Sequence, residues 1–161
     1  AYYRTLPALA PPEHDGHARI YSMAVELVIH SDNGAVRVTG STAPIKVDGD
    51  NGSVHVTNVS GPLQLESDNG RVEGTQLRST TVTADSDNGR VQLEFDAAPT
   101  TVVATSSTGR VEVVVPNDGT AYRVDLRTDN GSENLEVPTD PASERTITLR
   151  SDNGSVTART T

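Results

Sequence analysis

Apolar and polar residues alternate along most of the chain, in short stretches on either side of a recurring glycine. Relative to that glycine, apolar side chains stand seven and five residues before it and two and four residues after it. In the first unit these positions are Leu27, Ile29, Val36 and Val38, around Gly34. Alternation with a period of two is typical of a strand with one buried face. Each unit is therefore predicted to be two short strands that meet at the glycine.

The glycine belongs to a Ser-Asp-Asn-Gly block, or a close variant, that occurs seven times. Glycine is expected to supply a positive φ at this corner, asparagine to tolerate the left-handed region, and aspartate or serine to bond turn amides. Stacked corners are also expected to form side-chain ladders. The fifth block, Ser106-Ser107-Thr108-Gly109, departs from the pattern. The predicted turn residues of the other six are Asp32, Asn33, Gly34, Asp50, Asn51, Gly52, Asp68, Asn69, Gly70, Asp87, Asn88, Gly89, Asp129, Asn130, Gly131, Asp152, Asn153 and Gly154.

Two all-β architectures fit seven such units. An Asn-Gly pair between strands is a strong hairpin signal and allows an antiparallel β-meander. The alternative is a single-domain β-solenoid, in which each unit is one two-stranded coil and equivalent residues stack in parallel rows. We favour the solenoid, because repeating one residue at one place is useful only when the copies touch.

The units differ mainly in the connection between one unit and the next. These connections lengthen from six residues to eleven along the chain, and insertions in solenoids tend to collect on a binding face. The expected binding face consists of Glu94–Thr101, Val114–Arg123 and Glu136–Thr146. Glu133 stands in an otherwise apolar column, which suggests a bulge with Leu135 and Val137 facing inward.

Residues 1–22 precede the repeats and are interpreted as an N-terminal linker or cap, and residues 23–161 as the β-solenoid domain. The chain has 3% aromatic residues, which fits a thin core between two close sheets. No cysteine is present, so a thiolate metal site is excluded, and no cofactor is predicted. The net charge of −9 argues against nucleic acid as a partner.

Two sets of charged residues follow the repeat. Arg71, Arg90 and Arg110 come directly after three successive corner glycines, and such a row could contact an anionic glycan. The simpler interpretation is that Arg71 and Arg90 offset the nearby Asp68 and Asp87 on a solvated face. No metal site is predicted, because the acidic residues fit neither an EF-hand loop nor a β-roll motif. The weak candidate for a calcium cluster, disfavoured on these grounds, consists of Asp48, Asp50, Glu66, Asp68, Asp85 and Asp87.

The sequence has no nucleophile elbow, phosphate-binding loop or dinucleotide fingerprint, so it is not predicted to be an enzyme and no catalytic residue is assigned. A polysaccharide-acting β-helix enzyme is the disfavoured alternative. Its carboxylate pairs would have to stand out from the repeat, and here they follow it.

The Ser-Asp-Asn-Gly-x-Val units, with Val-x-Val after the corner and Leu-x-Leu-x-Ser before it, resemble the bacterial adhesin β-strand-repeat domains, also called toast-rack domains. The resemblance covers residues 24–161. It implies a solenoid-like fold and an extracytoplasmic or cell-surface location, with any membrane contact made through an anchor outside this sequence. It also implies a binding role toward a protein or glycan at the envelope, with a structural, oligomerisation or envelope-stress-signalling module as the alternative.

Overall fold

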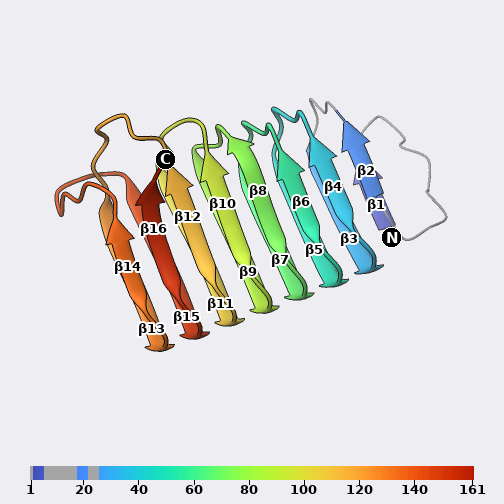
Figure 1. Cartoon of the computed structure of the whole chain (residues 1–161). Coiled ribbons are helices and arrows are strands. Elements are labelled where there is room, and N and C mark those ends of the chain that lie inside the picture. Colours follow the sequence, from blue (N-terminus) through green and yellow to red (C-terminus); the bar gives the residue numbers. More distant parts are fainter. Residues whose placement is uncertain (1, 6–17, 22–25) are drawn as a thin grey trace.

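The computed structural model describes residues 2–5, 18–21 and 26–161, with side chains for residues 19–21 and 26–161. Two eight-stranded sheets face each other across a narrow core (Figure 1). Successive strands from β3 onward alternate between the sheets, so each unit contributes one strand to each layer. The described part of the chain contains no helix long and apolar enough to cross a membrane.

The strands are short, and from β3 onward those of the first sheet have seven or eight residues and those of the second sheet four to six. Those of the first sheet are β1 (Tyr2–Thr5), β3 (Leu27–Asn33), β5 (Ile45–Asn51), β7 (Leu63–Asn69), β9 (Thr81–Asn88), β11 (Thr101–Thr108), β13 (Arg123–Asn130) and β15 (Thr146–Asn153). Those of the second sheet are β2 (Ala18–Tyr21), β4 (Val36–Thr39), β6 (Val54–Thr57), β8 (Val72–Leu77), β10 (Val91–Phe95), β12 (Val111–Val115), β14 (Glu133–Glu136) and β16 (Val156–Thr160).

Neighbouring strands pair in parallel, with equivalent repeat positions side by side. Leu27 pairs with Ile45 and Ile45 with Leu63 in the first sheet, and Val36 pairs with Val54 in the second. Among the described strands only β1 runs antiparallel, against β3. The β-solenoid prediction is therefore confirmed and the antiparallel meander is wrong. Both β1 and β2 fall in the segment predicted as linker or cap, and β2 extends the second sheet in parallel with β4.

The predicted apolar columns form the core. Leu27, Ile29, Val36 and Val38 of the first unit are almost completely buried, and units two to five and seven repeat this burial. At the one glycine in these columns, Gly74, the space for a side chain is taken by Leu77 and Leu93. Leu77 reaches inward because β8 contains an irregularity that shifts its register against β10.

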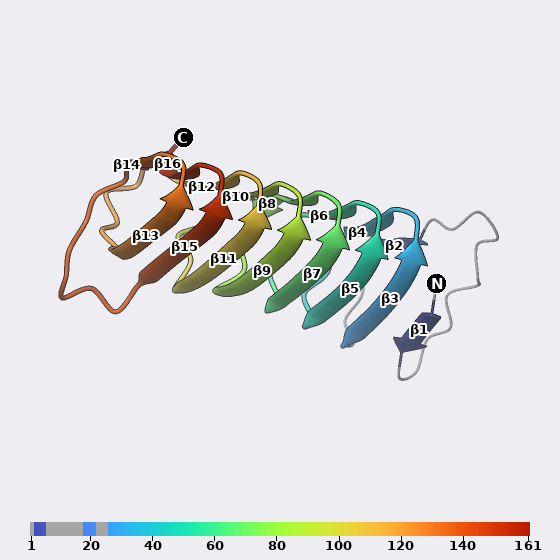
Figure 2. The same cartoon turned by 90° about the horizontal axis from the view of Figure 1, so that it is seen from below.

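The units do not stack in chain order. The first sheet runs β9, β11, β15, β13, and the second runs β10, β12, β16, β14. The seventh unit, β15–β16, therefore lies between the fifth and the sixth, and the sixth unit, β13–β14, is the end of the stack (Figure 2). The connection from β12 to β13 must pass over a whole unit, and the connection from β14 to β15 must return.

This order of the units explains why the charged Glu133 stands in an apolar column, and the predicted bulge there is wrong. Residues of β14 pair one-to-one with β16, from Glu133 with Val156 to Glu136 with Arg159, without a register shift. Leu135 is 47% exposed, contrary to prediction, whereas Val137 is buried as expected. Glu133 is exposed because its unit has a neighbour on one side only, and its carboxylate accepts a hydrogen bond from the backbone N–H of Thr128 on the edge strand β13 (3.1 Å). A charge at the inner position of an end unit disfavours stacking of a second copy there.

Candidate functional site

The Asp-Asn-Gly corners run along one edge of the solenoid and are held by contacts between units. At six of the seven corner glycines, a Cβ atom would overlap the carbonyl oxygen of the corner glycine in the neighbouring unit: Gly52, Gly70, Gly89, Gly109, Gly131 and Gly154. Only Gly34 and Gly109 of the seven have a positive φ (130° and 157°), and none of the corner asparagines has one. The prediction that these residues supply a left-handed turn is therefore wrong for most corners. Glycine is required there by the close approach of adjacent backbones.

Positive φ values occur instead at the opposite corner. Gly40, Asn58 and Gln76 have φ values of 71°, 54° and 53° and occupy equivalent positions after β4, after β6 and within β8. Each stands 18 residues from the next, like the units they belong to. The left-handed turn of the early units is thus made where the chain passes from one unit to the next.

The polar corner side chains form the predicted ladders, but not with the predicted partners. The asparagines bond one another along the stack: Asn69 donates to Asn51 (3.2 Å) and Asn88 to Asn69 (3.1 Å). Five of the six hydroxyls at the first block position donate to the corner glycine carbonyl of the adjacent unit, as Ser106 does to Gly89 (2.9 Å). The exception is Ser31, whose buried hydroxyl has no partner among the described residues. Serine thus bonds a carbonyl rather than a turn amide, and the corner aspartates are exposed.

Gly49 replaces serine in this ladder and offers a test of it. A Cβ atom at Gly49 would have its nearest neighbour, Val54 Cγ2, at 3.7 Å, so the site accepts a side chain. We expect Gly49→Ser to raise the free energy of unfolding by about 1 kcal/mol, through a hydrogen bond to Gly34 and a less flexible unfolded chain. Urea unfolding checks this, with Gly49→Ala as the control for the chain-entropy part. A serine variant no more stable than the alanine variant would contradict the hydrogen-bond contribution.

A hollow of about 370 Å³ lies at the opposite edge, where the long connections meet. It is lined by residues of all three predicted binding segments: Thr100, Thr120, Ala121, Ser143, Glu144 and Arg145. The half-buried Arg145 donates from Nη1 to the carbonyls of Ala98 and Pro99 (both 2.8 Å), and the Ser143 hydroxyl donates to the Ala121 carbonyl (2.9 Å). These bonds tie the three connections together around the hollow.

Tyr122, which follows the lining residue Ala121, anchors the middle connection in the core. Its side chain is completely buried, and its hydroxyl has no hydrogen-bond partner among the described residues. Burial, with a smaller contribution from the negative charge of Asp118, raises the pKa of Tyr122 to about 12, so the phenol stays neutral at ordinary pH. The Asp118 carboxylate accepts hydrogen bonds from Thr120, which lower its own pKa. The connection is therefore fixed at both ends of the segment 118–122.

Arg71, Arg90 and Arg110 form the predicted row. Their backbone carbonyls accept hydrogen bonds from Val54, Val72 and Val91 of the preceding units (2.8, 2.9 and 2.9 Å), which places them on adjacent units. All three are exposed, and none has a carboxylate within ion-pair distance among the described residues. The interpretation that Arg71 and Arg90 pair with nearby aspartates is therefore not supported by direct contacts.

The acidic residues of the candidate calcium cluster lie along the first sheet and its corner. Five of the six, all except Asp50, line a hollow of about 110 Å³. The outward-facing members are turned to neighbours: Asp48 lies 3.1 Å from His30 Nδ1, Glu66 accepts from Gln64 (2.7 Å), and Asp85 accepts from the Thr105 hydroxyl. Among the described residues, no three His, Asp or Glu side chains are arranged to hold one metal ion.

The sequence profile of the Toastrack family (DUF4097) matches residues 16–160, which is most of the chain. The chain belongs to the Toastrack family. The expected toast-rack membership is thereby confirmed. Neither the curated proteins nor the solved structures gave a match to this chain.

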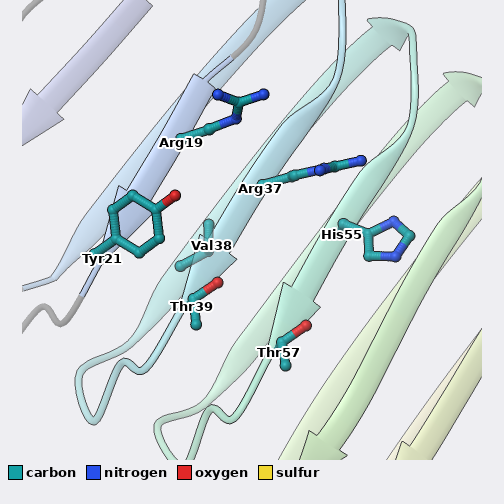
Figure 3. Close-up of a pocket in the computed structure, with 7 residues that line it drawn as sticks. All are labelled: Arg19, Tyr21, Arg37, Val38, Thr39, His55 and Thr57. Atoms are coloured by element: carbon teal, nitrogen blue, oxygen red, sulfur yellow. The ribbon is translucent and has the colours of Figure 1, made fainter.

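A further polar hollow was not predicted from the sequence. It lies on the outer face of the second sheet, over β2, β4 and β6, and includes Arg19, Tyr21 and Arg37 (Figure 3). Arg19 and Tyr21 were overlooked because residues 1–22 were interpreted as linker or cap. The available signal was the spacing, since Arg19 precedes Arg37 by 18 residues and Tyr21 precedes Thr39 by the same distance.

Proposed function

We propose that this Toastrack domain is a non-catalytic, extracytoplasmic domain of the bacterial cell envelope that binds a protein or glycan partner at the edge where its long connections meet. The hollow between those connections is the observation that supports the proposal most directly. It is built by three segments that are far apart in the sequence and are joined by the bonds of Arg145 and Ser143. Its volume of about 370 Å³ lies in the range of ligand pockets.

The length of the connections supports the proposal less than their convergence does. Two of the three, from β12 to β13 and from β14 to β15, need extra residues simply to pass over the seventh unit and return. Replacing them with six-residue connections would therefore disturb the order of the units as well as the hollow. Point substitutions within the hollow give a cleaner test.

A photo-crosslinking residue at Glu144, which lines the hollow, should capture a discrete partner from an envelope fraction of the source organism. The same residue at Ser107, on the Asp-Asn-Gly edge, should not. The bulky substitution Ala121→Phe fills the hollow and should abolish the crosslink, whereas Ala142→Phe should preserve it because Ala142 is exposed on the same connection and does not line the hollow. Thermal melting of both variants confirms that they fold.

Capture that is equal at Ser107, or that survives Ala121→Phe, would contradict the proposed face. Capture only from the cytoplasmic fraction would contradict the envelope location. The two parts of the proposal are thus tested separately.

A further inference from the structure

The hollow over β2, β4 and β6 has a different chemistry from the connection edge. Its volume is about 340 Å³, and it is lined by Arg19, Tyr21, Arg37, Val38, Thr39, His55 and Thr57. Six of these seven side chains form two rows across the sheet, and the seventh, Val38, is a buried core residue. Arg19, Arg37 and His55 occupy one row of paired positions, and Tyr21, Thr39 and Thr57 occupy the other.

The two arginines place adjacent positive charges on one face. Arg19 and Arg37 are direct partners in the register of β2 and β4, so their backbones are about 4.8 Å apart. Figure 3 shows both side chains on the same face of the sheet, with Arg37 extending from β4 toward β6. Like charges at directly opposite positions destabilise a sheet unless a counter-charge lies near them.

No carboxylate pairs with either arginine among the described residues, and the acidic residue of the same row, Glu73 on β8, contacts His55 Nε2 instead (3.2 Å). Four other exposed or half-buried arginines, Arg78, Arg127, Arg150 and Arg159, lie within 3.7 Å of a carboxylate oxygen. Arg19 and Arg37 have no carboxylate within 4.0 Å among the described residues. In a chain of net charge −9, two neighbouring guanidiniums without an ion-pair partner among residues 19–21 and 26–161 form a local site for an anion.

The second row supplies groups that a simple anion does not need. The Tyr21 side chain is 69% exposed beside the arginines and presents an aromatic face, which packs well against the C–H face of a pyranose ring. Thr39 and Thr57 add hydroxyls, of which Thr57 already bonds Thr75 on β8 (3.1 Å). An apolar ring face beside hydroxyls and two guanidiniums matches a sugar that carries an acidic substituent.

We infer that this hollow binds an acidic saccharide, a pyranose unit bearing a carboxylate or sulfate, with Arg19 and Arg37 on the anionic group and Tyr21 against the ring. The site lies on the outer face of the second sheet, away from the residues that line the connection hollow. A negative result for saccharide binding at this site would therefore leave the proposed function unaffected. The crosslinking variants, in turn, do not alter any residue that lines this site.

Isothermal titration of the full chain tests the inference with four probes: trigalacturonate, a sulfated heparin tetrasaccharide, neutral maltotriose and sodium sulfate. Trigalacturonate, the tetrasaccharide or both should bind more tightly than sulfate, and maltotriose should not bind. The double variant Arg19→Gln with Arg37→Gln should weaken binding by about tenfold or more, since each lost charged hydrogen bond has a large effect. Tyr21→Leu should lower the affinity for the acidic saccharides without changing the affinity for sulfate.

The matched control is Arg71→Gln with Arg90→Gln, which removes the same charge from the other unpaired arginine row. Its affinity should stay within about twofold of the parent, because Arg71 and Arg90 do not line the hollow and the attraction of distant exposed charges is screened by salt. An equal or larger loss in this control would place the anion contact on the corner row and overturn the inference. Failure of both acidic oligosaccharides to bind, or sulfate binding as tight as theirs, would also overturn it. All substituted side chains are exposed, so the variants should melt like the parent chain.

Discussion

Gly89→Ala is expected to lower the free energy of unfolding by more than about 4 kcal/mol, one of the largest effects of any single methyl group in the chain. The added Cβ would overlap the carbonyl oxygen of Gly70 in the neighbouring unit and lie 2.7 Å from its carbonyl carbon. Neither atom can move away alone, because both belong to backbones that are stacked by hydrogen bonds such as Val72 N–H to Arg90 C=O (2.9 Å). Relief of the overlap therefore requires separation of the third and fourth units.

Two other glycines separate this effect from the general cost of replacing glycine. Gly119 has a φ of 80° and open space around it, so Gly119→Ala should cost only about 1 kcal/mol for an alanine in the left-handed region. Gly49→Ala meets only ordinary contacts and should not destabilise. Urea unfolding of the three variants, followed by circular dichroism, gives the ranking. A Gly89→Ala variant no less stable than Gly119→Ala would show that the units can separate locally at little cost.

The sequence predicted the glycines correctly but assigned them the wrong role. Asn-Gly is a strong turn signal in hairpins, and a chain of hairpins would need the left-handed conformation at this pair. In a stack of parallel coils the same pair meets its own copy in the next unit. The requirement for glycine then comes from the backbone contact between Gly70 and Gly89. This contact joins two units, so the sequence of a single unit does not reveal it.

The apolar columns could be read from the sequence because burial depends only on the position within a unit. The order of the units could not, because units six and seven carry nearly the same pattern and either could stack on the fifth. Two signals were present nevertheless. Glu133 occupies an inner position that only an end unit tolerates, and the connections after β12 and β14 are the longest. The first was interpreted as a bulge and the second as a binding face.

The candidate site was predictable to a similar degree. The connections that contain Thr100, Thr120 and Arg145 were identified from their length, and they do meet around one hollow. Their mutual contacts depend on the order of the units and were not predictable. The pair Arg19 and Arg37 was missed because β2 belongs to an incomplete unit without a readable corner block, so its spacing was not connected with the repeat.

The order of the units predicts that one substitution has very different effects at two equivalent positions. Leu149 and Leu126 stand in the same apolar column and pair with each other across β15 and β13. Leu149 is completely buried between Leu126 and Ala104, whereas Leu126 is only partly buried at the end of the stack. Leu149→Ala should therefore lower the free energy of unfolding by about 3 kcal/mol, through lost burial and a cavity that stacked neighbours cannot fill.

Leu126→Ala should cost about 1 kcal/mol or less, because solvent already reaches the end unit and its fraying leaves the other units stacked. Urea unfolding followed by circular dichroism measures both variants under the same conditions. If the units stacked in chain order, the sixth would be internal and the seventh would be the end, so the ranking would be reversed. The identical substitution in one column thus removes differences in side-chain chemistry and leaves position in the stack as the only variable. A greater loss for Leu126→Ala than for Leu149→Ala would contradict the inserted seventh unit.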